Sequence, residues 1–238
     1  MDIAEVGVFA GDNAEDILQR ADPKTLFLID AWEFVAFSFG EHLGYISANE
    51  HQSADRYFKA AAPEWDGLDK NTALQIIYTK ARERFAHDPR VEIRRGMSWE
   101  VLNGLPEASL DVVYIDASHD FHEVLNDLWA AARCLRPGGM IMGHDFDDDL
   151  RQGHSGVNVI EAVQQFCKRS DYSLAVLTRE RSATYCLING RGPVWNAFSE
   201  ALVWSDIDFV ELPNIIAPQL KTRVLSKGGR VRTYHSFA

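Results

Sequence analysis

The sequence predicts an α/β fold, a doubly wound and mostly parallel sheet of seven strands in which the last strand runs antiparallel. Short apolar runs alternate with amphipathic segments, as expected of strands that helices cover on both faces. The first run ends in a turn containing Gly7 and Gly11 and leads directly into a helical pattern. Two strand-like runs, residues 172–177 and 184–188, follow each other without a helix, which indicates an antiparallel pair.

The remaining elements follow in order along the chain. Strands are expected to begin at Ile3 and to occupy residues 25–30, 91–96, 110–116 and 140–146. Helices are expected at residues 14–18, 71–86, 121–135 and 157–168, with a further helix starting near Ser98. Asp12 or Asn13 is expected to cap the first helix, and Ser98 the helix that it begins. An Arg-Pro-Gly-Gly run at residues 136–139 is expected to form the turn before the fifth strand.

The sheet and its helices are expected to form one domain over residues 1–190, followed by an extension over residues 191–238. An insertion at about residues 31–69 is rich in Trp, Phe and Tyr and is interrupted by Gly and Pro. It follows the second strand, at the edge where ligands bind in open α/β sheets. It is therefore expected either to close over a substrate or to form an oligomer contact, since aromatic residues are common in interfaces.

The composition of the chain narrows the range of partners. The chain is 46% hydrophobic and 25% charged, which is ordinary for a globular protein. Its net charge of −11 argues against nucleic acid as the main partner, because phosphate contacts need a basic surface. A small-molecule substrate is expected instead, and association into a homo-oligomer is an open alternative.

Cysteine usage and hydropathy indicate a cytoplasmic protein. Cys134, Cys167 and Cys186 are odd in number and widely spaced, which is typical of small buried residues in a reducing compartment. No apolar run approaches the roughly 18 residues of a membrane span, and the N-terminus lacks a signal-peptide pattern. No membrane partner is therefore expected.

The turn after the first strand is the first candidate site. A glycine-containing turn at the start of a helix binds a nucleotide or another cofactor in many α/β proteins, although it is also often only a turn. A dinucleotide-binding turn has the pattern Gly-x-Gly-x-x-Gly, whereas this chain offers Gly7 and Gly11 with Phe9 between them. Glu5 stands two residues before the first glycine. The pattern therefore points away from a dinucleotide.

The second candidate site residue is Asp30, which ends the second strand roughly 20 residues beyond the glycine turn. An acid at this place in a βαβ unit hydrogen-bonds the hydroxyl groups of a ribose. The alternative is that Asp30 caps the segment that follows it. Its place at the end of the strand favours the ribose contact.

Six segments in a fixed order carry a family resemblance: Glu-Val-Gly-Val-Phe-Ala-Gly at 5–11, Leu-Ile-Asp at 28–30, Arg-Gly-Met-Ser at 95–98, Val-Tyr-Ile-Asp-Ala-Ser-His at 113–119, Leu-Arg-Pro-Gly-Gly at 135–139 and Gly-His-Asp-Phe at 143–146. Together they resemble the class I S-adenosylmethionine-dependent methyltransferases, which have a Rossmann-like fold. Their first motif reads acid-x-Gly-x-Gly-x-Gly, and here Phe9 replaces the middle glycine. The most similar branch contains small-molecule O-methyltransferases that modify sugars and natural products, several of which need magnesium.

The resemblance implies contacts to S-adenosylmethionine from four parts of the chain. These are Glu5, Gly7, Phe9 and Gly11 around the methionine part, Asp30 at the ribose, Met97 and Ser98 beside the adenine, and Asp116 facing the reacting methyl group.

Asp116 and Asp145 end the fourth and fifth strands, so both carboxylates are expected to open into one crevice. In the metal-dependent relatives, acids at these strand ends hold Mg²⁺, which lowers the pKa of the substrate hydroxyl groups. Those relatives usually have two consecutive acids on the fifth strand, whereas His144 takes the first place here. Imidazole suits softer ions than Mg²⁺. The sequence therefore leaves three alternatives for Asp116 and Asp145: they bind Mg²⁺, they bind another divalent ion, or they bind no ion.

His119 and His144 are alternative candidates for the base that deprotonates a substrate hydroxyl, because histidine titrates near neutral pH. The structural alternative for His119 is a loop residue that caps the next helix. For His144 the alternative is a hydrogen-bonded core histidine.

The sequence therefore predicts an enzyme that transfers a methyl group from S-adenosylmethionine to a hydroxyl group of a small molecule. The first alternative is a protein that keeps this fold for binding and has lost the transfer activity. The second is a nicotinamide-dependent enzyme, which Phe9 and the antiparallel terminal pair disfavour.

Overall fold

The computed structural model describes residues 1–33, 69–146, 158–180, 182–212, 221–227 and 230–236. Most of the predicted aromatic insertion, residues 34–68, lies outside the described residues. Within them, no helix combines the length and the hydrophobicity needed to cross a membrane.

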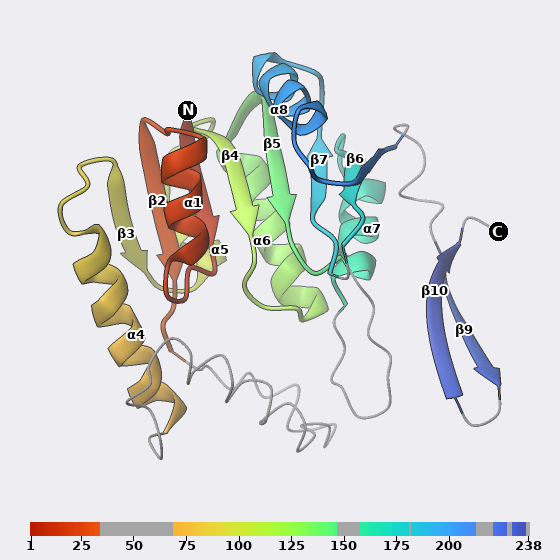
Figure 1. Ribbon diagram of the computed structural model, residues 1–238, viewed down its shortest axis with the longest axis horizontal. Helices are drawn as coiled ribbons and strands as arrows, with labels where there is room; N and C mark the ends of the chain where they lie inside the picture. The colour runs from red at the N-terminus through yellow and green to blue at the C-terminus, as the bar shows by residue number, and fades with distance from the viewer. Residues whose placement is uncertain (34–68, 147–157, 181, 213–220, 228–229, 237–238) are drawn as a thin grey trace.

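One mixed sheet organises the molecule, with strand order β3-β2-β1-β4-β5-β7-β6-β8 (Figure 1). The strands β1 to β5 pair in parallel, while β7 runs antiparallel to both β5 and β6. This arrangement confirms the predicted class. The strand bounds are β1 Asp2–Val6, β2 Thr25–Asp30, β3 Val91–Arg95, β4 Leu110–Ile115, β5 Leu135–Gly143, β6 Ser173–Thr178, β7 Tyr185–Ile188 and β8 Phe209–Glu211.

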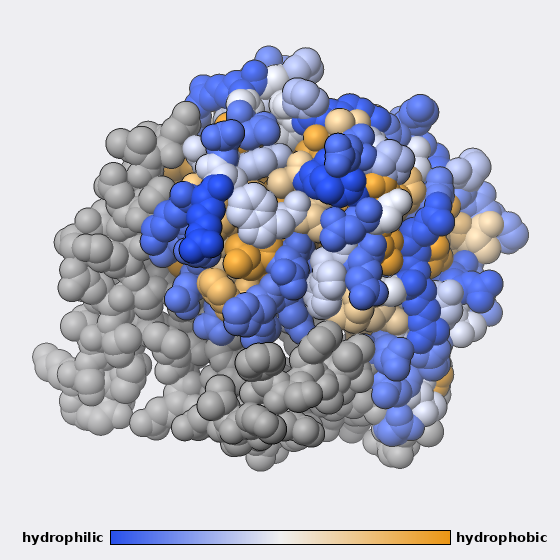
Figure 2. Space-filling view, turned by 180° about the vertical axis from the view of Figure 1, so that it is seen from behind, coloured by the Kyte–Doolittle hydropathy of each residue, from blue (hydrophilic) through white to orange (hydrophobic). Residues whose placement is uncertain are grey.

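Helices cover both faces of the sheet, as the apolar strands require (Figure 1). Buried residues of α1, α4 and α8 form one core cluster with the strands, and buried residues of α5, α6 and α7 form the other. The face opposite to the view of Figure 1 is mostly hydrophilic, with hydrophobic residues in small separate patches (Figure 2). The helix bounds are α1 Asp12–Arg20, α4 Lys70–Phe85, α5 Ser98–Gly104, α6 Phe121–Cys134, α7 Val159–Arg169 and α8 Pro193–Val203.

The region after residue 190 adds to the sheet, which the sequence did not predict. Helix α8 packs against the sheet, and β8 pairs antiparallel with β6 as an eighth strand. Strands β9 (Lys221–Lys227) and β10 (Arg230–Ser236) form a separate antiparallel hairpin.

The predicted helix caps are wrong. Helix α1 begins after Gly11, which has a left-handed backbone with φ 86° and provides no side-chain cap. Asn13 instead donates a hydrogen bond to Glu5. Helix α5 begins after Met97, and the Ser98 hydroxyl donates to Asp127 on α6. Both polar side chains therefore bond to residues of other elements rather than to their own helix ends.

The turn expected at residues 136–139 is part of β5. Helix α6 ends at Cys134 and β5 begins at the next residue, where Leu135 pairs with Leu110 of β4. The pairing then resumes at Met140 with Val112, so the Pro-Gly-Gly segment forms an irregularity within the strand. A Cβ on Gly139 would lie 2.9 Å from the carbonyl oxygen of Asp111, so this close approach requires glycine.

Candidate functional site

The candidate site lies along the edge of the sheet where β1, β2, β4 and β5 end (Figure 1). These strands are parallel neighbours, so the residues that follow each of them meet at this edge. The order of strands therefore gathers predicted site residues from four distant parts of the chain.

The β1–α1 loop has a left-handed backbone at every second residue. The φ angles are 86° at Gly7, 49° at Phe9 and 86° at Gly11. Phe9 thus adopts the backbone conformation that the middle glycine of the motif would adopt. This conformation is strained for a bulky residue and is therefore rare. A Cβ on Gly7 would overlap the carbonyl oxygen of Asp116, whereas a Cβ on Gly11 would meet the Phe85 ring of α4. Gly7 therefore lets the loop touch the end of β4.

Asp30 holds this loop in place. Its Oδ2 atom accepts hydrogen bonds from the backbone N–H groups of Val8 and Phe9, both at 2.9 Å. Its Oδ1 atom accepts from the Trp32 N–H at 2.7 Å, and the Trp32 indole N–H donates to the carbonyl oxygen of Phe9 at 2.9 Å. The structure thus shows a loop-ordering role that the sequence analysis did not identify.

Glu5 is a buried acid beneath the loop, with only 1% of its surface exposed. Asn13 donates a hydrogen bond of 3.1 Å to its Oε1 atom, and its Oε2 atom has no partner. Burial raises the pKa of Glu5 to about 8, although the Asn13 hydrogen bond opposes the shift. The unpaired Oε2 atom of Glu5 can accept a hydrogen bond from a positively charged group that reaches it.

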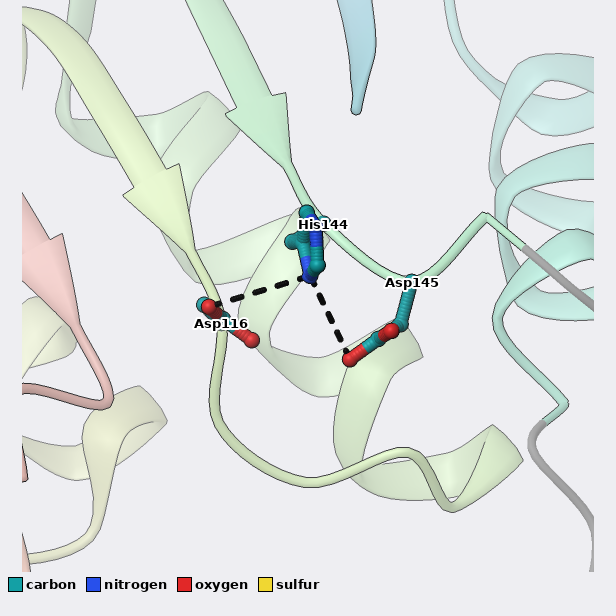
Figure 3. Close-up of side chains that lie close together, drawn as sticks. All are labelled: Asp116, His144 and Asp145. Carbon is teal, nitrogen blue, oxygen red and sulfur yellow. Dashed lines mark ion pairs between the residues drawn. The ribbon is translucent and has the colours of Figure 1, made fainter. Parts of the chain in front are cut away.

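The four predicted catalytic residues meet at the ends of β4 and β5. His119 Nε2 lies 2.9 Å from Asp145 Oδ2, and His144 Nδ1 lies 3.4 Å from the same oxygen and 4.0 Å from Asp116 Oδ2. Figure 3 shows Asp116, His144 and Asp145 pointing toward one another. Asp145 has a φ of 52°, an uncommon backbone conformation for an aspartate at a strand end.

The contact between His119 and Asp145 is electrostatic rather than a regular hydrogen bond. The two atoms are close enough, but Nε2 of His119 makes no hydrogen bond of regular geometry. All four side chains remain partly open, with exposed fractions of 37% for Asp116, 40% for His119, 30% for His144 and 24% for Asp145. A small hollow at this edge, with room for about one water molecule, is lined by Asp116, His119 and His144 among others.

The two carboxyl groups of the cluster titrate differently. The adjacent His119 and His144 hold the pKa of Asp145 well below its usual range. Burial raises the pKa of Asp116, although His144 opposes that shift. The contact with Asp145 raises the pKa of His144 despite partial burial. Asp145 is therefore an ionised carboxylate that stabilises positive charge on His144.

The same cluster offers donor atoms for a metal ion. One ligand atom each from Asp116, His144 and Asp145 all lie within 4.8 Å of one another. Two carboxylate oxygens and one imidazole nitrogen suit Mn²⁺, Fe²⁺ or Zn²⁺ better than Mg²⁺, which prefers oxygen ligands.

Met97 and Ser98 lie at the start of α5, after β3, where Ser98 contacts a buried acid that the sequence analysis missed. Asp127 of α6 is 1% exposed and accepts a hydrogen bond from the Ser98 hydroxyl. The sequence could have indicated that Asp127 is buried, because this residue falls within the apolar face of α6, beside Val124 and Leu128. Burial raises the pKa of Asp127 to about 7.

Asp127 should make the stability of the protein depend on pH. Its pKa is higher in the folded than in the unfolded state, so the free energy of unfolding falls as pH rises from about 4 to about 7. Asp127→Asn removes this titration and keeps an acceptor for Ser98. We expect the variant to be more stable than the parent near pH 8 by roughly 2 kcal/mol. Urea unfolding near pH 5 and pH 8 measures the difference, and Glu161→Gln, which removes an exposed acid of α7, is the control.

A family model described as a methyltransferase domain matches residues 4–146 of this chain. The match covers more than half of the sequence and includes the β1–α1 loop and all four residues of the cluster.

The chain belongs to the class I S-adenosylmethionine-dependent methyltransferases. None of the curated protein sequences compared with it matches significantly.

Solved structures share the fold of this methyltransferase at low sequence identity. Spermidine synthase from Thermotoga maritima is 13% identical, with TM-score 0.50 over 81% of this chain and 55% of its own. A probable spermidine synthase from Corynebacterium glutamicum is 14% identical, with TM-score 0.50 over 91% and 68%. An O-methyltransferase family protein from Burkholderia thailandensis is 13% identical, with TM-score 0.49 over 80% and 51%. The chain thus spans about half of the first and third proteins, and the two likenesses with TM-score 0.50 show the fold alone.

The β1–α1 loop of this methyltransferase fits the methionine part of S-adenosylmethionine. The unpaired Oε2 atom of Glu5 is an acceptor for an amino group, and the carboxylate of Asp30 is half-buried at the adjacent strand end. The close approach of Gly7 to Asp116 brings the loop next to the cluster of Asp116, His119, His144 and Asp145.

Removing the Asp30 carboxylate should loosen the cofactor loop. Asp30→Ala deletes the acceptor of three backbone N–H groups, two of them in the loop itself. We expect affinity for S-adenosylhomocysteine to fall by about 10- to 100-fold, since each lost hydrogen bond to a charged group costs about 1.5–3 kcal/mol and part of this is recovered by water. Calorimetric titration measures the loss. Asp16→Ala, on the exposed face of α1, should bind normally, and normal binding by both variants would contradict the role of Asp30.

Proposed function

We propose that this methyltransferase acts on a hydroxyl group of a small molecule, such as a sugar or a natural product. The observation that supports the proposal best is the cluster of Asp116, His119, His144 and Asp145 beside the cofactor loop. Transfer to an alcohol needs a base at the reacting oxygen, and this cluster offers two histidines next to an ionised carboxylate.

In this proposal His119 is the base. Nε2 of His119 faces the Asp145 carboxylate at 2.9 Å, so the other ring nitrogen, Nδ1, would take the proton of the substrate hydroxyl, and Asp145 would stabilise the imidazolium that forms. S-adenosylmethionine supplies an electrophilic methyl group, whose bond to sulfur breaks as its bond to the substrate oxygen forms. Glu5 would hold the amino group of the cofactor, and Asp30 would hold its ribose. Asp116 faces the reacting centre, and the protein contributes mainly by holding the two reactants in line.

A second candidate is a metal-assisted version of the same transfer. The compact arrangement of Asp116, His144 and Asp145 favours it, because their ligand atoms lie within 4.8 Å of one another. A divalent ion held there would lower the pKa of a substrate hydroxyl. A protein that binds the cofactor without transfer activity is the third candidate.

Calorimetric titration with S-adenosylhomocysteine, with and without Mg²⁺ or Mn²⁺, tests the cofactor and the metal, with NAD as the control. Release of S-adenosylhomocysteine during incubation with a panel of hydroxylated acceptors then tests the transfer. Binding of the homocysteine compound and a product on at least one acceptor support the proposal. Binding without turnover on any acceptor would favour the binding protein, and no binding in any condition would reject all three candidates.

A further inference from the structure

The end of α8 and the start of β8 expose an unusual set of apolar side chains. Trp204 is 83% exposed, Val203 65%, Ile207 52% and Val210 44%. These four residues fall within eight consecutive positions, and we call them the α8–β8 patch. A large exposed aromatic residue with apolar neighbours is typical of a protein–protein contact.

Acidic residues surround this patch. Glu200, Asp206 and Asp208 are exposed, and no Lys or Arg occurs between residues 200 and 211. Within the described part of the chain none of these three carboxylates forms an ion pair, whereas Glu211 pairs with Arg191. Strand β8 also lies at the end of the sheet order, so its outer edge has no strand neighbour among the described residues. The patch therefore suits a partner that is extended, basic and partly apolar.

The hairpin of β9 and β10 has this character. It contains five basic residues and no acid, although the chain as a whole has a net charge of −11. The pairing of Arg230 with Lys227, and of Arg232 with Leu225, sets the register. Because residues alternate between the two faces of a strand, this register places the basic residues at positions of one face: Lys221, Arg223, Lys227, Arg230 and Arg232. The other face has Thr222, Val224, Val231 and Thr233.

A two-stranded hairpin is at best marginally stable in water by itself, so it needs a surface to pack on. The hairpin forms a separate sheet and does not pair with β8 of the same chain. The α8–β8 patch remains exposed although the hairpin of the same chain is present. In Figure 1 the hairpin stands apart from α8.

We propose that the hairpin of one copy docks on the α8–β8 patch of a second copy, and that the exchange is reciprocal in a two-fold symmetric dimer. A two-fold arrangement uses both hairpins and both patches and leaves neither free. Apolar contacts around Trp204 supply most of the affinity, while the basic residues of the hairpin pair with Asp206 and Asp208 and select the partner. Helix α8 lies at the end of the sheet opposite to the ends of β4 and β5, so the dimer leaves the catalytic cluster open (Figure 1).

Sedimentation velocity of the full chain tests this dimer. The parent protein should sediment as a dimer. Asp206→Lys with Asp208→Lys should be monomeric at the same concentration, and so should Arg230→Glu with Arg232→Glu. A mixture of the two variants should form a heterodimer, because opposite charges then meet at both of its hairpin–patch contacts. The four substitutions in one chain should restore the homodimer. Asp16→Lys with Glu100→Lys, on α1 and α5, changes the charge equally and should stay dimeric.

Trp204→Ser provides a second test that does not depend on the charged residues. Trp204 is largely exposed, so the variant should fold and dimerise at least about tenfold more weakly. A parent that stays monomeric at every concentration, or a dimer that neither charge reversal nor Trp204→Ser weakens, would overturn the proposal. So would binding of a single-stranded RNA oligonucleotide by a monomeric parent that is lost in Arg230→Glu with Arg232→Glu, since the hairpin would then serve nucleic acid. All of these outcomes are independent of the methyl acceptor.

Discussion

Gly7→Ala should abolish binding of S-adenosylhomocysteine and destabilise the fold. A Cβ at this position would overlap the backbone carbonyl oxygen of Asp116, and neither strand end can move without disturbing the pairing of β1 with β4. The φ of 86° adds backbone strain for any residue other than glycine. We expect the free energy of unfolding to fall by about 3 kcal/mol and the affinity to fall by more than about 100-fold.

Gly190→Ala is the matched control for this substitution. A Cβ at Gly190 would meet no atom within 4 Å, so stability and binding should both remain close to those of the parent. Urea unfolding and calorimetric titration measure the two effects separately. Normal affinity in Gly7→Ala would show that the contact between the loop and the end of β4 is not needed by the cofactor.

His119→Ala should lower kcat by about 100- to 10,000-fold, the usual contribution of a general base. Affinity for S-adenosylhomocysteine should stay within about threefold of the parent, because the ion pair of His119 is with Asp145 and not with the β1–α1 loop. Added imidazole should restore part of the rate. Asp145→Asn should also reduce kcat, and should change the pH dependence of kcat because the ionised carboxylate of Asp145 raises the pKa of His144.

His87→Ala, at an exposed position far from the cluster along the sheet, is the control for loss of a histidine. The comparison with His144→Ala separates the two versions of the reaction. A base at His119 predicts the larger loss in His119→Ala. A metal site predicts the larger loss in His144→Ala, together with loss of bound Mn²⁺ by direct metal analysis. Full activity in His119→Ala would exclude it as the base.

Most of the fold could be predicted because buried parallel strands leave continuous apolar runs, as in residues 25–30 and 110–115. Strand β8 was missed because it has only three residues and two of them are exposed. The irregularity in β5 was missed because Pro137, Gly138 and Gly139 have the composition of a turn, and only the pairing with β4 shows that the strand continues through them.

The cluster could be predicted because Asp116 and Asp145 directly follow two neighbouring parallel strands. The carboxyl ends of such strands lie at the same edge of the sheet, so the two side chains come close together. The roles of Asp30 and Asp127 could not, because their hydrogen bonds join residues 22 and 29 positions apart. Local sequence gives no sign of such a bond. The ribose contact proposed for Asp30 remains a prediction beside its loop-ordering role.

The unpaired oxygen of Glu5 should make ligand binding at the β1–α1 loop depend on pH. With a pKa near 8, the carboxyl group carries a proton at neutral pH when nothing is bound. An amino group arriving at that oxygen favours the carboxylate, so the proton leaves as the ligand enters. Occupancy of the loop therefore increases as the medium becomes more alkaline, up to the pKa of the free protein.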